Sequence, residues 1–189
     1  MPRIRTFLGI DLGEQIRERL VSLQELLALD APDVNWVEPE NLHITLLFLG
    51  EVDQKETLDI CRAAQKAVKG MPAFGVSIEG AGCFPNARRP RTLWVGVGKG
   101  VQELCDVHDA IEAPLLEMGN YRRETRAYTP HVTLGRVKGE RDNDALSMAL
   151  TKHKTWSAGE TMVNEVRVMS SKLTADGPTY NVLGRAKLG

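Results

Sequence analysis

Two segments decide the fold of this chain: Asn41-Leu42-His43-Ile44-Thr45-Leu46 and Thr129-Pro130-His131-Val132-Thr133-Leu134. Both contain the pattern His-x-Thr-Leu, with apolar residues between and after the polar pair. Successive side chains of a β-strand point to opposite faces, so the histidine and threonine of each copy share one face. Each segment is therefore expected to be a strand with one packed face and one polar face.

The order of predicted elements around the two segments repeats along the chain. Short runs rich in β-branched residues predict strands, and apolar stripes at helical spacing predict helices. The first half predicts a strand at 5–12, a helix to about 30, a strand at 42–50, a helix at 58–68 and a strand at 76–79. The second half predicts a strand at 92–97, a helix at 104–115, a strand at 131–137, a helix at 145–152 and strands at 163–170 and 179–185.

This repetition predicts a duplicated β-α-β-α-β architecture with the two motifs on corresponding strands. No flexible linker separates the copies, so we expect one domain over residues 1–189 whose two lobes correspond roughly to halves of the chain. Pro114 lies within the third predicted helix and should kink it or end it early, because proline cannot donate the helical hydrogen bond. A turn is expected at Thr174-Ala175-Asp176-Gly177-Pro178, between the closing strands.

The polar faces of the two motif strands suggest phosphodiester chemistry. If the lobes are related by a pseudo-twofold axis, two imidazoles and two hydroxyls meet around one ligand. A neutral imidazole can take a proton from water, an imidazolium can give one to a leaving alkoxide, and hydroxyls can bind the non-bridging oxygens. Histidine suits both roles because its unperturbed pKa is about 6.5.

A structural role or metal binding would also explain a histidine in one copy of the motif. One His-x-Thr in an apolar strand is usually structural, but here two of only four histidines occupy matching positions, which favours catalysis. His108 and His153 lack such partners and are expected to be ordinary surface or boundary residues. No His-Glu-x-x-His pattern or cysteine cluster accompanies the motifs, so we expect no metal and no cofactor.

Composition limits the class of partner and the compartment. The 189 residues are 42% hydrophobic and carry a formal net charge of -1, which gives no field to hold a long nucleic acid. Any RNA partner is therefore expected to be held at one end. The apolar run before Asp11 is too short for a signal-peptide core, and no stretch reaches membrane-spanning length. We expect a cytoplasmic monomer that does not bind membranes.

Beyond the motifs, similarity to one family extends over most of the chain. The sequence resembles the RNA 2′,3′-cyclic phosphodiesterase family, also called RNA 2′-5′ ligases, of the two-histidine phosphoesterase superfamily. The resemblance implies a bilobal α+β fold, made by duplicating a β-α-β-α-β unit, with mainly antiparallel sheets around a central cleft. It also implies metal-independent hydrolysis of RNA 2′,3′-cyclic phosphate ends to 2′-phosphomonoesters, with reversible 2′-5′ ligation. The segments that carry the resemblance are Phe7-Leu8-Gly9-Ile10-Asp11, residues 36–52, Phe84-Pro85, residues 88–91, Leu93-Trp94, residues 128–137 and the closing segments at 173–185.

The resemblance further implies a role for each site residue. His43 would be the proton donor to the departing 3′ oxygen and His131 the proton acceptor from water, although the symmetry of the motifs alone does not separate the two roles. Thr45 and Thr133 would bind the phosphate.

Two further substrate-binding residues are implied by the resemblance: Arg136 would contact the phosphate, and Phe48 would stack on a base. Strict strand alternation points both side chains away from the catalytic face. The strand must therefore end or bulge near Gly135 for Arg136 to reach the phosphate. For Phe48, a position in the core is the alternative.

Several alternatives stay open at this stage. The substrate could instead be a small cyclic nucleotide such as ADP-ribose cyclic phosphate, or a 2′-5′ oligoadenylate, and a non-catalytic RNA-end binding protein would keep the same cleft. Two arginine clusters, at 88–91 and 122–126, fit either solvated surface or contacts to RNA phosphates.

Overall fold

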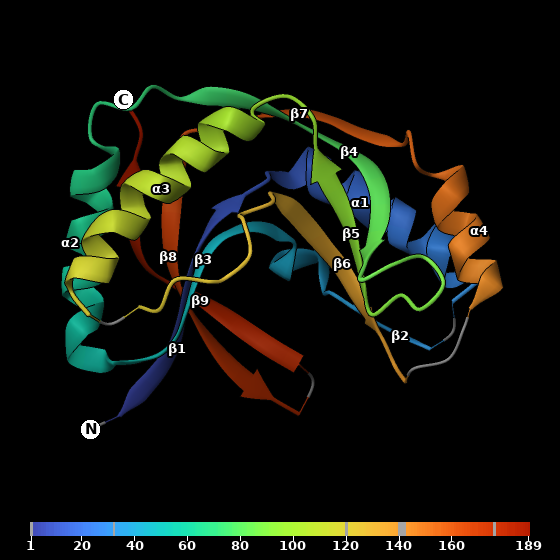
Figure 1. Cartoon of the computed structure of the whole chain (residues 1–189), viewed down its shortest axis with the longest axis horizontal. Coiled ribbons are helices and arrows are strands. Elements are labelled where there is room, and N and C mark those ends of the chain that lie inside the picture. The colour runs from blue at the N-terminus through green and yellow to red at the C-terminus, as the bar shows by residue number, and fades with distance from the viewer. Residues whose placement is uncertain (1, 32, 120, 140–142, 176) are drawn as a thin grey trace.

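The computed structural model describes residues 2–31, 33–119, 121–139, 143–175 and 177–189 (Figure 1). Strands and helices alternate along most of the chain. The strands are β1 (Arg3–Asp11), β2 (Val34–Trp36), β3 (His43–Asp53), β4 (Phe74–Phe84), β5 (Thr92–Val97), β6 (His131–Val137), β7 (Ser157–Val163), β8 (Glu165–Thr174) and β9 (Gly177–Lys187). The helices are α1 (Glu14–Ala28), α2 (Thr57–Val68), α3 (Val101–Glu117) and α4 (Asp144–Lys152), with short 3-10 helices η1 (Pro39–Asn41) and η2 (Gln54–Glu56).

The described strands form one curled antiparallel sheet (Figure 1). Its order is β7-β4-β5-β6-β3-β1-β8-β9, with β2 paired to β6. This confirms the expected α+β fold with antiparallel pairing. The two motif strands, β3 and β6, are neighbours at the centre, and they pair through Ile44 and Val132 alone. The sheet therefore has two halves that meet at the two His-x-Thr-Leu motifs.

Each half of the sheet takes strands from distant parts of the chain. The C-terminal strands β8 and β9 extend the half that begins with β1 and β3, whereas β4 and β5 from the middle of the chain extend the half of β6. The helices also cross over, because α1 follows β1 yet contacts β7, and α3 follows β5 yet contacts β3. Each lobe therefore contains strands from both halves of the chain, whereas each lobe was expected to correspond roughly to one half.

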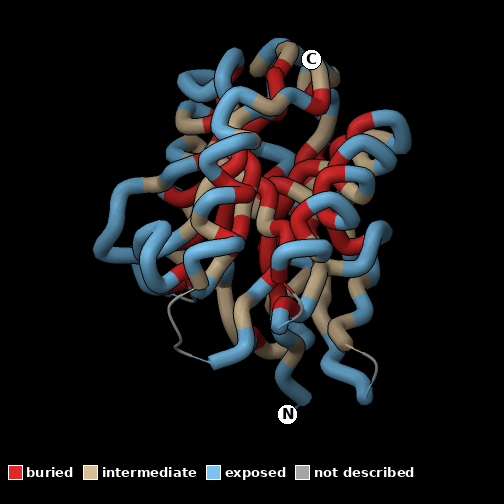
Figure 2. The backbone as a smooth tube through the Cα atoms, turned by 90° about the vertical axis from the view of Figure 1, so that its right-hand side faces the viewer, coloured by how far each residue is buried: buried red, intermediate tan, exposed pale blue. Residues whose placement is uncertain are grey.

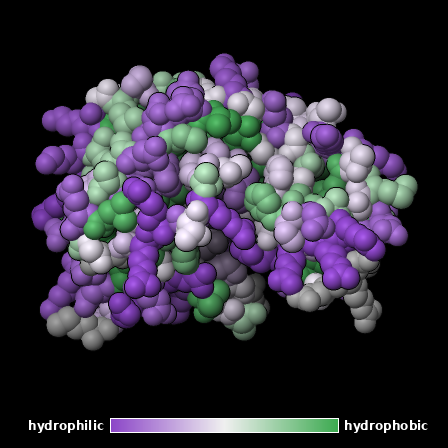
Figure 3. Space-filling model, in the orientation of Figure 1, coloured by the Kyte–Doolittle hydropathy of each residue, from purple (hydrophilic) through white to green (hydrophobic). Residues whose placement is uncertain are grey.

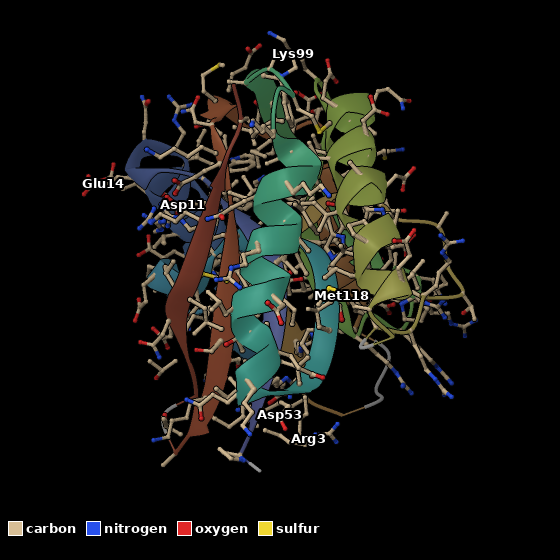
Figure 4. All side chains as sticks on the ribbon, turned by 90° about the vertical axis from the view of Figure 1, so that its left-hand side faces the viewer. Arg3, Asp11, Glu14, Asp53, Lys99 and Met118 are labelled. Atoms are coloured by element: carbon tan, nitrogen blue, oxygen red, sulfur yellow. The ribbon has the colours of Figure 1, made fainter. Side chains whose placement is uncertain are left out.

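A continuous apolar core runs between the sheet and the helices (Figure 2). The inward residues of both motifs belong to it, since Ile44, Val132 and Leu134 are fully buried. Helices α2 and α3 lie side by side over the half of the sheet that contains β1 (Figure 4). The core thus holds one face of each motif strand rigidly and leaves the other face for the histidines and threonines. None of the helices in the described residues has the length and apolar character needed to cross a membrane.

Two local features differ from the predictions. Helix α3 continues through Pro114 to Glu117, so the expected early end is wrong. The proline lies in the last turn, where the amide of Met118 still bonds to the Pro114 carbonyl and Leu115 anchors the turn in the core. Strands β2 and β7 were not predicted, because β2 is very short and β7 is largely polar. In the expected turn between β8 and β9, Asp176 lies outside the described residues.

Candidate active site

His43 is the first residue of β3, and two hydrogen bonds hold its ring. Its Nδ1 lies 2.6 Å from the carbonyl oxygen of Asn41, which can only accept, so Nδ1 carries the proton. Its Nε2 lies 2.8 Å from the hydroxyl of Thr45. The first motif therefore arranges its own histidine and threonine as a bonded pair.

Aromatic rings enclose His43 on the side of β1 and β9. The ring centroids of Phe7 and Tyr180 lie 4.9 Å and 5.5 Å from the His43 centroid. On β1, Gly9 leaves room for the imidazole, because a Cβ there would lie 3.0 Å from the Ile44 carbonyl oxygen and 3.1 Å from His43 Cδ2. The first histidine thus sits in a fitted, largely apolar pocket.

This enclosure changes the protonation of His43. Burial lowers its pKa below the ordinary value, because the charged imidazolium loses hydration. The hydrogen bond to the Asn41 carbonyl and the charge of Asp11 act in the opposite direction, and the charge of His131 lowers the pKa further. Without a ligand, the neutral form of His43 is favoured at pH 7.

His131, the first residue of β6, has a similar anchor but a more open surrounding. Its Nδ1 donates to the Thr129 carbonyl oxygen at 2.8 Å, which leaves Nε2 free for a ligand. Among the described residues, no hydrogen bond engages that Nε2. The Phe84 ring meets His131 edge-on at 5.3 Å and packs in turn on Trp94 at 5.1 Å.

The pairing of β3 with β6 brings the two motifs together. Because Ile44 and Val132 are direct partners in antiparallel strands, continuing the register sets Thr45 opposite His131 and His43 opposite Thr133. Thr45 and His131 line the same groove, and the two imidazoles influence each other electrostatically. The structure therefore gathers all four polar motif residues at one place.

A β-bulge follows each motif and resolves the problem of strand alternation. In β3, Leu47 pairs with Leu8 and Thr45 with Gly9, so Leu46 is an extra residue. In β6, Gly135 pairs with Leu93 and Thr133 with Trp94, so Leu134 is extra. Each bulge adds one inward residue, and the next side chain returns to the face of the histidine and threonine.

The side chains that return to this face are Phe48 and Arg136, which occupy equivalent positions in the two strands. The bulge meets the condition stated for Arg136, and Phe48 is 39% exposed, so it is not a core residue. The guanidinium carbon of Arg5 lies 4.8 Å from the Phe48 ring centroid. Arg136 bonds to the Thr92 hydroxyl at 3.4 Å and acts electrostatically on Tyr180.

Two supporting residues were missed by the sequence analysis. The amide of Gln24 on α1 donates to the carbonyls of Leu134 at 2.8 Å and Val37 at 2.9 Å, and so holds the β6 bulge. The hydroxyl of Tyr128 donates to the Thr45 carbonyl at 3.0 Å. For Gln24, the sequence indicates such a role only by placing a polar residue within the apolar stripe of a helix. For Tyr128, which precedes the second motif, no sequence pattern indicates the contact with Thr45.

His108 is more than the ordinary boundary residue that was expected. Its ring stacks on Tyr128 with centroids 4.4 Å apart and planes at 8°, and only 12% of its side chain is exposed. Asp109 and Glu112 lie beside it, and their ligand atoms could surround a metal ion. Glu112 already accepts hydrogen bonds from Tyr121 and Arg123, which explains its burial without a cation.

A groove of about 970 Å³ starts at the two motifs and extends well beyond them. Thr45 and His131 lie at one end with Phe48 and Phe84. Helix α3, Tyr121 and residues 123–129 form most of the rest of its wall. Hydrophilic side chains dominate the face shown in Figure 3, which is hollowed near its centre.

Sequence comparison places the chain among named relatives. A family model described as LigT-like phosphoesterase matches residues 10–94. The chain is 37% identical over 178 residues to a Methanothermobacter thermautotrophicus protein named RNA 2′,3′-cyclic phosphodiesterase, covering 94% of this chain and 95% of that protein. It is 32% identical over 189 residues to the Aquifex aeolicus protein of the same name, covering 100% of both.

Solved structures show the same fold. A protein of Thermus thermophilus superposes with a TM-score of 0.83 at 25% identity, covering 98% of each chain. Escherichia coli LigT complexed with 3′-AMP superposes with a TM-score of 0.76 at 23% identity, covering 99% of each chain. These matches confirm the expected fold and the resemblance. The chain therefore belongs to the LigT-like phosphoesterase family.

Proposed function

We propose that this protein hydrolyses 2′,3′-cyclic phosphates at RNA ends to 2′-phosphomonoesters, with His43 and His131 as its acid–base pair. The observation that carries the proposal is the common anchoring of the two imidazoles. In both, Nδ1 donates to a backbone carbonyl two residues earlier, so Nε2 is the nitrogen available to exchange a proton. Relatives at 32% to 38% identity, named RNA 2′,3′-cyclic phosphodiesterase, support the same substrate class.

The reaction moves two protons and exchanges one bond at phosphorus. Water forms the new P–O bond while its proton passes to His131, and the bond from phosphorus to the 3′ oxygen breaks while His43 protonates that oxygen. The hydroxyls of Thr45 and Thr133 donate to the non-bridging oxygens, whose charge grows in the transition state. Arg136 pairs with the same charge, and Phe48 stacks on the terminal base.

The lowered pKa of His43 constrains this assignment. A general acid must be protonated before the reaction, yet burial favours the neutral ring. A bound phosphate carries negative charge, and an opposite charge within a few ångströms favours the charged imidazolium. His43 therefore gains its proton when the cyclic phosphate enters, which links substrate binding to activation of the acid.

The test is product analysis with an RNA oligonucleotide that ends in a 2′,3′-cyclic phosphate. Phosphorus NMR should show conversion to the 2′-phosphomonoester, with the same rate in excess EDTA. Formation of the 3′-phosphomonoester, or no hydrolysis, would reject the proposal. Loss of activity in EDTA that added divalent ions restore would reject the metal-independent mechanism. With a second RNA that ends in a 5′-hydroxyl, slow reversible joining is the expected side reaction: the 5′ oxygen bonds to phosphorus while the bond to the 3′ oxygen breaks, which leaves a 2′-5′ linkage.

We also propose that the chain acts as a single-domain monomer in the cytoplasm. The four motif residues of the proposed site all come from one chain, so the proposed reaction needs no partner subunit. Sedimentation equilibrium should give the mass of one chain, 20.9 kDa. A dimer at micromolar concentration would contradict this.

A further inference from the structure

We infer that the groove beyond the motifs binds the nucleotides on the 5′ side of the cyclic phosphate, so that the preferred substrate is an RNA chain and not a mononucleotide. This inference rests on the proposed function and extends it to the part of the substrate that does not react. It also assigns a role to Arg126, a member of the arginine cluster at 122–126 that the reaction itself does not use.

The groove is large for a site that binds a single small ligand. Sites for single small ligands have volumes of about 300 to 1,000 Å³. A volume of about 970 Å³ is at the upper limit, although only one end contains motif residues. The groove continues from Thr45 and His131 along α3, past His108 and Glu112, to Tyr121. The groove therefore has room beyond the motifs for more of the substrate than its terminal nucleotide.

Exposed aromatic side chains line the groove at its catalytic end. Phe48 and Phe84 line the groove and are 39% and 37% exposed, which is unusual for large apolar side chains. Single-stranded RNA is bound by stacking of unpaired bases on such rings, and each stack is worth about 1–3 kcal/mol. Two aromatic side chains near one scissile phosphate offer stacking surfaces for two successive bases.

Charged side chains are distributed unevenly along the wall of the groove. The carboxylate of Glu112 is paired with Arg123, and Asp109 accepts from His108. Glu124 is the remaining carboxylate of the wall, and it interacts with Tyr121 at the far end of the groove. Arg126 also lines the groove, and it is closer in sequence to the second motif than Glu124 is. Within the described residues, Arg126 forms no ion pair. It is therefore available for an RNA phosphate.

The experiment compares substrates of increasing length with the same terminal nucleotide: a 2′,3′-cyclic mononucleotide, a dinucleotide and a trinucleotide. We expect kcat/KM to rise at least tenfold from one to two or three nucleotides and then to level off. Hydrolysis at the same kcat/KM for all three would overturn this inference and leave the proposed function standing. No hydrolysis of any of them would instead reject the proposed function.

Two arginines of one loop provide a matched pair of variants. Arg126 lines the groove, whereas Arg122 is exposed outside its wall. Arg126→Ala should lower kcat/KM for the trinucleotide about fivefold more than for the mononucleotide, whereas Arg122→Ala should leave both unchanged. The dependence of log kcat/KM on log salt should become shallower by about 0.7 in Arg126→Ala, because one phosphate contact is lost. Equal effects of the two variants would contradict the assignment of Arg126.

A second inference rests on a separate contact: we infer that Tyr128 is a positioning residue that ties the two motifs to each other. The strands β3 and β6 share the single pair Ile44 and Val132, so their ladder fixes the spacing of the imidazoles weakly. The Tyr128 hydroxyl donates to the Thr45 carbonyl, and the carbonyl of the next residue, Thr129, accepts from His131. One dipeptide thus contacts both motifs.

The ring of Tyr128 is itself held in place. It stacks on His108, which projects from α3, and burial raises the pKa of its hydroxyl, so that the group stays protonated and remains a donor. If this contact sets the distance between the imidazoles, its loss should act on the chemical step and not on binding.

Tyr128→Phe tests this because it keeps the ring and removes one hydrogen bond. We expect kcat to fall about three- to tenfold, the equivalent of one neutral hydrogen bond, with KM unchanged. His108→Phe, which preserves the stack, should retain most of the activity that His108→Ala loses. A wild-type kcat in Tyr128→Phe, or a change in KM alone, would overturn the positioning role.

Discussion

The two halves of the sheet present the same motif in different surroundings. In the first, His43 packs against Phe7 and Tyr180, bonds to Thr45 and has a lowered pKa. In the second, His131 meets one aromatic edge and opens into the groove. The motif therefore fixes the direction of each imidazole, whereas the strands beside it enclose His43 and leave His131 more open. This difference distinguishes the two histidines of an otherwise symmetric pair.

The largest expected effect comes from removing either imidazole. His43→Ala and His131→Ala should each lower kcat by about 10² to 10⁴, because each loses one proton transfer. The double variant should be little worse than the single ones, since the pair acts as a unit. Circular dichroism and the melting temperature should show that His131→Ala stays folded. Near wild-type turnover in either variant would contradict the assignment of the two histidines as an acid–base pair.

Variants of the two threonines should lower kcat by less, and their pH dependence should differ between the two halves of the sheet. Thr45→Val and Thr133→Val each remove one donor to the phosphate, which is worth about a hundredfold in kcat. Thr45 also bonds to His43, so Thr45→Val should in addition change the pH dependence, whereas Thr133→Val should not. The measurement is kcat across pH for both variants. Identical pH profiles would remove the distinction between the two threonines.

Variants of Phe48 and Arg136 test the roles of the two side chains that the bulges turn toward the site. Arg136→Ala should raise KM about tenfold and weaken its salt dependence, because a charge is removed beside the phosphate. Phe48→Ala should raise KM to a similar extent with no change in salt dependence, because stacking carries no net charge. Lys138→Ala, an exposed cation close to Arg136 in the chain, is the control and should behave as wild type. A common salt response in the Phe48 and Arg136 variants would argue against these separate roles.

The smallest effect is expected at Asp11, the β1 partner of His43. Its charge raises the pKa of His43, so Asp11→Asn should lower that pKa further. If His43 is the acid, activity is lost as pH rises through its pKa, and the alkaline limb of kcat/KM should move to lower pH. Asp30→Asn, at an exposed site after α1, should leave the limb in place. A shift of the acidic limb instead would assign His43 as the base.

The sequence predicted those features that depend on local periodicity. The alternation in the two motif strands and the stripes of α1 and α2 identified most elements, and the repeated His-x-Thr-Leu identified the residues that meet at the centre of the sheet. The exchange of β8 and β9 between lobes was not predicted, because strand pairing across the chain has no local signature. The roles proposed for His43, Thr45, His131 and Thr133 stay predictions.

The bulges illustrate why the rest of the site could not be predicted. Leu46 and Leu134 become extra residues only because β1 and β5 pair on both sides of them in a particular register. That register decides whether Phe48 and Arg136 face the core or the cleft. Gln24 contributes to it from a distant helix, and Tyr128 acts through a backbone carbonyl, so neither contact depends on a pattern in the surrounding residues.

The most direct measurement is the pH dependence of kcat for a cyclic-phosphate oligonucleotide in wild type, His43→Ala and His131→Ala. Wild type should give a bell-shaped curve, because one imidazole must be protonated and the other neutral. Each variant should lose a different limb of the bell: the alkaline limb with His43→Ala and the acidic limb with His131→Ala. Persistence of both limbs in either variant would contradict the account that two imidazoles act on one phosphorus.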